Sequence, residues 1–238
     1  MSVFAGPKIV GTPEGGNIIF GIDAGNTKSY PGSGTTILSS VQSQNASLGG
    51  GATFNSAGYF SFIDQVDDRI TTSAINYPAA WSDPTTLEIW VYFDSDGVWS
   101  NGFAGSLFFV GSTAGGFGLI RSSIAERLAM WARPAGTGYQ SFGFITGRDQ
   151  WHHVVGTWDG ATDVILYING VGSAPAAVTV SSVPDVGGYT MGGTSATIST
   201  SAGNYMKGRV AIARMYNRAL TAAEVLQNFN AHRGRFGL

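Results

Sequence analysis

The chain has 238 residues, a formal net charge of −2 and no cysteine, and 12% of its residues are charged. The length fits a single all-β sandwich, and the missing cysteine excludes disulfides, thiolate metal sites and a thiol nucleophile. No cluster of lysine and arginine points to a phosphate backbone, so nucleic acid is not an expected partner. The high glycine content, 35 residues, is typical of many short strands joined by glycine turns.

The first residues, MSVFAGPKIV, lack the basic start and long apolar run of a secretion signal. No apolar run approaches the ~20 residues of a membrane-spanning helix, so no membrane span is expected. Residues 1–17 are rich in turn residues and are expected to form an N-terminal arm. Residues 18–238 are expected to form one domain, because strand patterns continue on both sides of the polar stretch at 39–58.

Short apolar or alternating runs separated by turn residues predict strands along the whole domain. The predicted strands are residues 18–22, 59–63, 69–73, 86–93, 106–110, 117–121, 127–132, 140–145, 151–158, 163–168, 178–182, 189–192 and 205–216. In residues 86–93, apolar residues alternate with Glu88, Trp90 and Tyr92, and both faces are apolar at the middle. Such a strand is expected at the centre of a sandwich with a further layer over its back.

Residues 151–170, WHHVVGTWDGATDVILYING, are expected to form a hairpin around which the fold is organised. Asp159-Gly160 predicts a type I′ turn, because both central positions of that turn need a positive φ. Asn169-Gly170 is a second turn signal. His152 and His153 are adjacent, so they point to opposite faces and cannot chelate one metal together. One is expected inside and the other in solvent.

A short helix is predicted near the end of the chain. Thr221 and Glu224 form a capping box, and Ala222, Val225, Leu226 and Phe229 then recur on one helical face. With the closely spaced strands before it, this helix predicts an all-β fold, an antiparallel β-sandwich of jelly-roll type with a short C-terminal α-helix.

Three motifs resemble one known family. WHHVVGTWDG followed by VILYING resembles the hairpin of laminin-G-like, concanavalin-A-like jelly rolls, and GRVAIARMYNRALTAAEV resembles their closing strand and capped helix. Phe62-Ile63-Asp64 to Asp67-Asp68 resembles their opening strand, although Gln65 replaces the usual glycine. The resemblance covers about residues 55–230 and implies the concanavalin-A-like jelly roll.

A second resemblance covers the two ends of the domain. GPKIV, IDAGNTKSYPGSGTT and the closing YNRAL to EVLQNFNAHRGRF are similar to laminin-G-like virion proteins of tailed phages, especially those of cyanobacteria. This implies a non-catalytic structural component of the virion exterior, on the capsid or on a tail or fibre. Its expected partners are other virion proteins and further copies of itself. The alternative is an adhesin module that binds host-surface carbohydrate.

The jelly-roll fold is shared with glycan hydrolases, which need two carboxylates about 5–5.5 Å apart for retaining chemistry. Glu88 and Asp94 lie six residues apart on one strand, a separation of roughly 20 Å at strand rise. The E-x-D-x-E run of the related hydrolases reads EIWVYFD here. The chain is therefore not expected to be an enzyme.

Aromatic residues in predicted loops are the candidate contact residues, either for sugar faces or for partner proteins. They are Trp81, Trp99, Phe103 and Tyr139, with Phe4 in the N-terminal arm.

Members of the resembled family often hold a calcium ion at a rim of the sandwich, through oxygen ligands. Asp67 and Asp68 match the family's acidic turn, and Asp94 and Asp96 lie in DSDG, which resembles a fragment of a calcium loop. The alternative is that all four are ordinary turn residues. No cofactor is required by the sequence, and calcium is the one ion it suggests.

Overall fold

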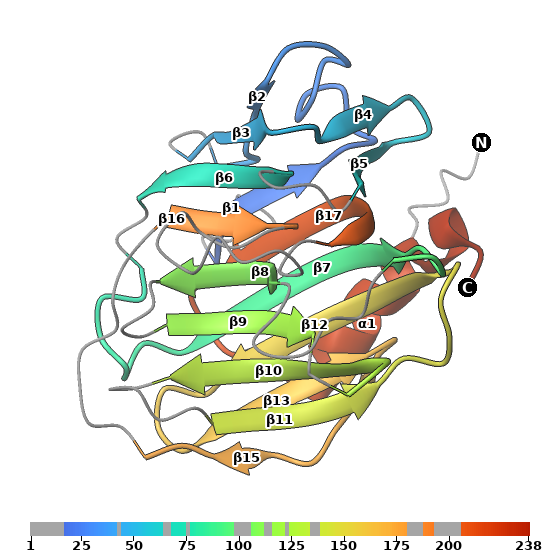
Figure 1. The fold of residues 1–238 in the computed structure, drawn as a ribbon. Helices are drawn as coiled ribbons and strands as arrows, with labels where there is room; N and C mark the ends of the chain where they lie inside the picture. Colours follow the sequence, from blue (N-terminus) through green and yellow to red (C-terminus); the bar gives the residue numbers. More distant parts are fainter. Residues whose placement is uncertain are drawn as a thin grey trace, which may run out of the picture.

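The computed structural model describes residues 17–41, 44–63, 68–74, 77–97, 106–111, 116–121, 124–133, 139–179, 188–192 and 206–238. Within these residues two antiparallel sheets pack face to face, and a helix covers the back of the first sheet (Figure 1). This confirms the predicted β-sandwich with a short C-terminal helix. The predicted N-terminal arm, apart from Asn17, lies outside the described residues.

Sheet A has nine strands in the described residues. They are β1 (Ile18–Asp23), β4 (Thr53–Asn55), β5 (Tyr59–Ile63), β7 (Thr85–Phe93), β12 (Trp151–Trp158), β13 (Asp163–Ile168), β14 (Val171–Gly172), β15 (Ala176–Ala177) and β17 (Lys207–Tyr216). Their order is β14-β13-β12-β7-β17-β5-β4, with β1 paired to β17 and β15 paired to β13. The closing strand β17 therefore joins the N-terminal strand β1 to the centre of the sheet.

Sheet B has eight strands in the same ranges. They are β2 (Thr36–Ile37), β3 (Ala46–Gly49), β6 (Arg69–Ala74), β8 (Ser106–Gly111), β9 (Gly116–Arg121), β10 (Arg127–Arg133), β11 (Tyr139–Phe144) and β16 (Gly188–Met191). Their order is β11-β10-β9-β8-β16-β6-β3-β2. The prediction of a strand at 178–182 is wrong for Val178 and Thr179, which follow the short strand β15 and are not part of a strand. Residues 180–182 lie outside the described ranges.

Strand β7 lies at the centre of sheet A, between β12 and β17. Leu87, Ile89 and Val91 are buried in the core between the sheets. On the opposite face the ring of Trp90 stacks on Phe236 with centroids 4.2 Å apart. The predicted burial of both faces of this strand is thus confirmed, because the C-terminal segment supplies the outer layer (Figure 1).

Helix α1 (Ala222–His232) leads into the 3-10 helix η3 (Arg233–Phe236). The predicted capping box is present, with Thr221 N donating to Glu224 Oε2 at 2.9 Å. The apolar-face prediction is wrong at two positions, because Ala222 is exposed and Leu226 is 46% exposed, whereas Asn228 is fully buried. Among the described residues, no helix is long and apolar enough to cross a membrane.

Removing the helix cap is expected to destabilise the protein modestly. Thr221→Ala removes the acceptor for Glu224 N, which lies 3.3 Å from Thr221 Oγ1, and should cost about 1 kcal/mol of unfolding free energy. Urea unfolding followed by circular dichroism measures this loss. Thr221→Ser keeps the cap oxygen and is the matched control, so an equal loss in both variants would contradict the capping explanation.

The type I′ turn lies at a different position from the predicted one. Asn169 and Gly170, which join β13 to β14, have φ values of 51° and 82°. A four-residue loop instead joins β12 to β13, and there Asp159 Oδ1 accepts the N–H groups of Ala161 and Thr162, both at 2.8 Å. The Asp159 side chain thus replaces the tight two-residue turn with a wider loop.

The two adjacent histidines point to opposite faces of β12, as predicted, but neither faces solvent. His152 pairs in register with Val91 on the core side, and His153 stacks on Phe229 of α1 with centroids 5.9 Å apart. Both are fully buried. The prediction of one exposed histidine is wrong because α1 covers the outer face of the sheet.

Candidate functional site

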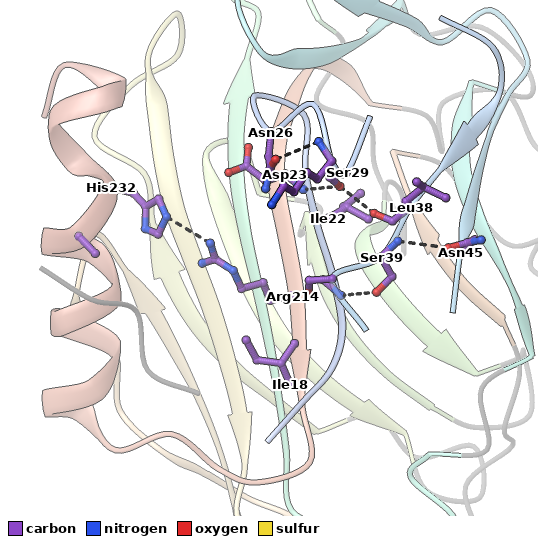
Figure 2. A pocket seen from close by; sticks show the side chains of 14 residues that line it. Ile18, Ile22, Asp23, Asn26, Ser29, Leu38, Ser39, Asn45, Arg214 and His232 are labelled. Carbon is purple, nitrogen blue, oxygen red and sulfur yellow. Dashed lines mark hydrogen bonds between the residues drawn. The ribbon is translucent and has the colours of Figure 1, made fainter. Parts of the chain in front are cut away.

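A cavity of about 890 Å³ lies between β1, the loop after it and the C-terminal half of α1 (Figure 2). We call it the β1–α1 pocket. Its lining residues are Ile18, Gly21, Ile22, Asp23, Asn26, Lys28, Ser29, Leu38, Ser39, Ser40, Asn45, Arg214, Ala231 and His232. Residues from both ends of the domain therefore form one cavity.

The loop after β1 is fixed by side chains that bond to its own backbone. Asp23 Oδ1 accepts Gly25 N at 2.9 Å, and Asn26 Oδ1 accepts Lys28 N at 3.0 Å. Ser29 Oγ donates to a backbone carbonyl of the opposite wall at 2.8 Å. Such turns are the usual role of Asp and Asn in loops, and here they hold Lys28 at the cavity.

The opposite wall of the pocket is held by Ser39 and Asn45. Ser39 Oγ accepts Gly21 N and Val41 N, each at 3.1 Å. Asn45 Oδ1 accepts Ser39 N at 3.3 Å. The amide nitrogen of Asn45 and the exposed side chain of Ser40 add polar atoms to the cavity, so this wall is both rigid and polar.

Arg214 lies at the helix side of the pocket, with its side chain only 8% exposed. Its Nη1 donates to Glu88 Oε1 at 2.9 Å, and its Nη2 lies 3.2 Å from His232 Nε2 (Figure 2). A guanidinium has five N–H donors, and these two acceptors use one on each terminal nitrogen. These two contacts fix the orientation of the Arg214 guanidinium, and the guanidinium has further N–H groups beyond the two that they use.

Behind Arg214 lies a fully buried polar cluster centred on Glu88. Its Oε1 accepts from Arg214 and from His153 Nε2, the latter at 3.1 Å. Its Oε2 accepts Tyr216 Oη at 2.6 Å and Asn228 Nδ2 at 3.1 Å. Four donors on one carboxylate satisfy a charge that burial would otherwise make very costly.

The charge state of this cluster is set by burial and by its cation. Burial raises the pKa of Glu88, but the Arg214 guanidinium and then His153 and Tyr216 outweigh burial and hold that pKa well below its usual range. Burial, reinforced by the Glu88 carboxylate, raises the pKa of Tyr216. Glu88 is therefore ionised and Tyr216 protonated, and Arg214 has a permanent counterion.

His232 is a neutral hydrogen-bond acceptor for Arg214. Its Nδ1 lies 3.2 Å from Asn228 O, so that nitrogen donates the proton and Nε2 faces the guanidinium. Burial lowers the pKa of His232, and the adjacent Arg214 charge lowers it further. A negative charge brought into the pocket would act in the opposite direction on this pKa.

Trp81, one of the aromatic candidates from the sequence, does not line this pocket. Trp81 is only 3% exposed, packs on Phe117 at a centroid distance of 4.5 Å and accepts a hydrogen bond from Trp158 Nε1 at its carbonyl. The expectation that it is an exposed contact residue is wrong, because its loop folds back onto the core. The other four candidates fall outside the described part of the chain: Trp99, Phe103, Phe4 and the side chain of Tyr139.

The acidic candidates that the structure describes, Asp68, Asp94 and Asp96, already have protein partners. Both oxygens of the fully buried Asp68 accept backbone N–H groups, at 2.6 Å and 2.8 Å. Asp94 lies 3.5 Å from Arg209, and Asp96 pairs with a lysine, while Asp67 lies outside the described residues. In the described ranges no group of three or more His, Asp or Glu could hold a metal. Calcium binding stays a prediction.

Arg214 and the function of Glu88 in holding it were not predicted from the sequence. A signal was present: Glu88 lies inside the apolar strand TTLEIWVYF, and Arg214 lies inside the apolar stretch VAIARMY. A charge within a buried strand needs a partner. The two residues are directly opposite in the register of β7 and β17.

Residues 64–226 match a laminin-G-type family model described as the concanavalin A-like lectin/glucanases superfamily. The chain belongs to this superfamily. A search of curated protein sequences found no match. The family model begins after β5 and ends within α1, so part of the β1–α1 pocket lies outside the matched segment.

Solved structures with low sequence identity share the fold of this superfamily member. The receptor binding domain of botulinum neurotoxin C/D mosaic serotype has a TM-score of 0.69 at 13% identity, over 90% of this chain and 51% of that one. Trypanosoma rangeli sialidase, in complex with sialic acid, has a TM-score of 0.69 at 16% identity, over 92% of this chain and 34% of the sialidase. The binding domain of Paraclostridial Mosquitocidal Protein 1 has a TM-score of 0.70 at 15% identity, over 91% of this chain and 52% of that one. The chain thus spans about half of the toxin domains and a third of the sialidase.

Proposed function

We propose that this superfamily member is a non-catalytic binding module that holds a carbohydrate in the β1–α1 pocket. The observation that carries the proposal is the mixed lining of the cavity. Lys28 and Arg214 supply donors and Asp23 supplies acceptors, as hydroxyl groups require. Ile18 and Leu38 add apolar surface, which suits the C–H faces of a sugar ring.

The non-catalytic part of the proposal is supported by the carboxylates. Glycoside hydrolysis needs two of them flanking one bond. Among the described lining residues only Asp23 carries a carboxylate, and its Oδ1 lies 2.8 Å from Arg235 Nη1. Glu88 lies behind Arg214, with four donors on its two oxygens and no exposed surface. Neither carboxylate is placed as a free acid or base.

Proteins of the same fold support carbohydrate as the ligand class. The botulinum neurotoxin serotype D ligand binding domain was solved in complex with N-acetylneuraminic acid, and the Trypanosoma rangeli sialidase with sialic acid. These likenesses concern the fold, at 14% and 16% identity. They suggest the ligand class to test, and we propose the β1–α1 pocket as its site.

Filling the pocket is expected to abolish carbohydrate binding without unfolding the protein. Leu38 lines the cavity and is 43% exposed, so Leu38→Trp places an indole in the ligand volume. We expect at least a tenfold loss of signal on a glycan array and an unchanged melting temperature. Val171→Trp, at a 72% exposed position of β14 outside the pocket lining, is the control. Retention of full binding by Leu38→Trp would contradict the proposed site.

We further propose that the module works on the exterior of a tailed-phage virion, as a capsid, tail or fibre component. The two stretches that resemble phage proteins are in contact, because Arg235 Nη1 donates to Asp23 Oδ1 at 2.8 Å. Both stretches line the β1–α1 pocket. Gold-labelled antibody against the chain should decorate intact particles, and size-exclusion chromatography should show an oligomer. A strict monomer that never associates with particles would contradict this location.

A further inference from the structure

We propose that the β1–α1 pocket selects sugars that carry a carboxylate, and that Arg214 receives this carboxylate. The inference rests on the proposed function, because it names the ligand class for the same pocket. Arg214 is more than nine-tenths buried, lines the cavity and keeps N–H groups beyond those bonded to Glu88 and His232. A planar guanidinium held on two sides is preorganised for a carboxylate, which it can bind through two parallel hydrogen bonds.

The charged side chains around the pocket carry one net positive charge, which one anion would balance. Glu88 neutralises Arg214, and Arg235 neutralises Asp23. Lys28 lines the same cavity and adds one further positive charge to the two neutralised pairs. A monoanionic sugar that binds Arg214 would also balance the charge of Lys28 across the cavity, whereas a neutral sugar would leave the Lys28 charge unbalanced. Charge complementarity of this kind gives specificity more than raw affinity.

The remaining polar atoms of the cavity suit the hydroxyl groups of the same sugar. Asn26 and Asn45 use their side-chain oxygens for the backbone at 3.0 Å and 3.3 Å, which leaves their amide nitrogens as donors. Ser40 is exposed at the cavity. The carboxylate is thereby assigned to the helix side and the hydroxyl groups to the loop side (Figure 2).

Proton uptake by His232 is expected to accompany carboxylate binding. The charged groups that face His232 are Arg214 from β17, Glu88 from β7 and Asp23 from β1, with Lys28 across the cavity. Without ligand, Arg214 disfavours the protonated imidazole. A bound carboxylate can bridge the two cations, so the pKa of His232 rises in the complex. Affinity therefore increases as the pH falls through the ordinary histidine range, by about three- to tenfold between pH 7.5 and 5.5.

The test is calorimetric titration of the full chain with matched pairs of sugars. The probes are the methyl glycoside of N-acetylneuraminic acid against its methyl ester, and methyl glucuronide against methyl glucoside. Each carboxylate form should bind at least tenfold more tightly than its neutral partner, and more tightly at pH 5.5 than at pH 7.5. Equal affinity within each pair, or tighter binding of the neutral form, would overturn the inference.

Three variants locate the effect. Lys28→Met removes the charge of an exposed side chain and should weaken carboxylate binding about threefold or more while the melting temperature is unchanged. Arg214→Lys should reduce the preference for the carboxylate form, and His232→Gln should flatten the pH dependence. Arg214 also pairs with Glu88, so Arg214→Lys can change stability as well as binding, and its melting temperature must be measured alongside. Lys28→Met removes no such ion pair among the described residues and needs no such correction. Unchanged carboxylate binding in Lys28→Met together with an unchanged pH dependence in His232→Gln would overturn the inference.

The failure of this inference is distinguishable from failure of the proposed function. If neutral sugars bind as well as acidic ones and Leu38→Trp abolishes both, the pocket binds carbohydrate and the carboxylate selectivity is wrong. If none of the probes or arrayed glycans binds at either pH, both proposals are wrong. If acidic sugars bind and Leu38→Trp has no effect, the pocket is not the site and both assignments to it are wrong.

Discussion

Gly208→Ala is expected to destabilise the sandwich by about 3 kcal/mol or more. Gly208 lies in β17 with a φ of +154°, between Phe93 of β7 and Phe62 of β5 in the strand register. A Cβ atom built there would lie 2.1 Å from the carbonyl oxygen of Tyr92. That oxygen belongs to the backbone of the central strand, so relief requires β7 and β17 to separate.

Urea unfolding followed by tryptophan fluorescence measures this effect. Gly234→Ala is the matched control, because a Cβ at Gly234 meets no atom within 4 Å and its φ is not positive. The control should change the free energy of unfolding by no more than about 0.5 kcal/mol. Equal midpoints for the two variants would contradict the close approach of β17 to β7.

Glu88→Ala is expected to cost about 3–5 kcal/mol of stability. The variant leaves the guanidinium of Arg214 buried without its counterion and removes an acceptor from three other donors: His153, Tyr216 and Asn228. Since Asn228 lies on α1, the loss also weakens the contact of the helix with sheet A. Asp96→Ala removes an ion pair with a 70% exposed carboxylate and should cost no more than about 1 kcal/mol.

The contribution of Glu88 should also depend on pH. Its pKa is lower in the folded protein than in the unfolded chain, so the folded state binds fewer protons. The stabilisation is therefore fully present above the ordinary glutamate pKa of about 4.3 and is lost as the pH falls below it. The stability difference between wild type and Glu88→Gln should shrink from pH 6 to pH 3. A difference that stays constant across this range would contradict an ionised Glu88 in the folded state.

The fold was largely predictable because its signals are local. The alternation of side chains in residues 86–93 predicted which residues of β7 face the core. The capping box at Thr221 and Glu224 predicted where α1 begins. The hairpin of β12 and β13 follows from two apolar runs around a loop. The turn type was missed because Asp159 binds the loop backbone with its side chain, an interaction that the dipeptide does not specify.

The candidate site was not predictable, because it depends on residues that meet only in three dimensions. Glu88 and Arg214 are 126 positions apart and become partners through the register of β7 and β17. Asn228 is a polar residue of a helix, and it is fully buried because its amide donates to the Glu88 carboxylate beneath it. Trp81 looked exposed because it lies in a loop, but that loop is pinned to the core by Trp158. Tertiary packing thus overrode the local signal at each of these positions.

The most direct test of carbohydrate binding in the β1–α1 pocket is a nuclear magnetic resonance titration of the isotopically labelled chain. The methyl glycoside of N-acetylneuraminic acid is added at pH 6, and backbone amide and imidazole shifts are followed. We predict that the largest changes fall on Gly21, Asn26, Ser39 and His232, which line the cavity from both ends of the domain. Changes confined to the loop at residues 94–97, or no saturable change at all, would contradict the account.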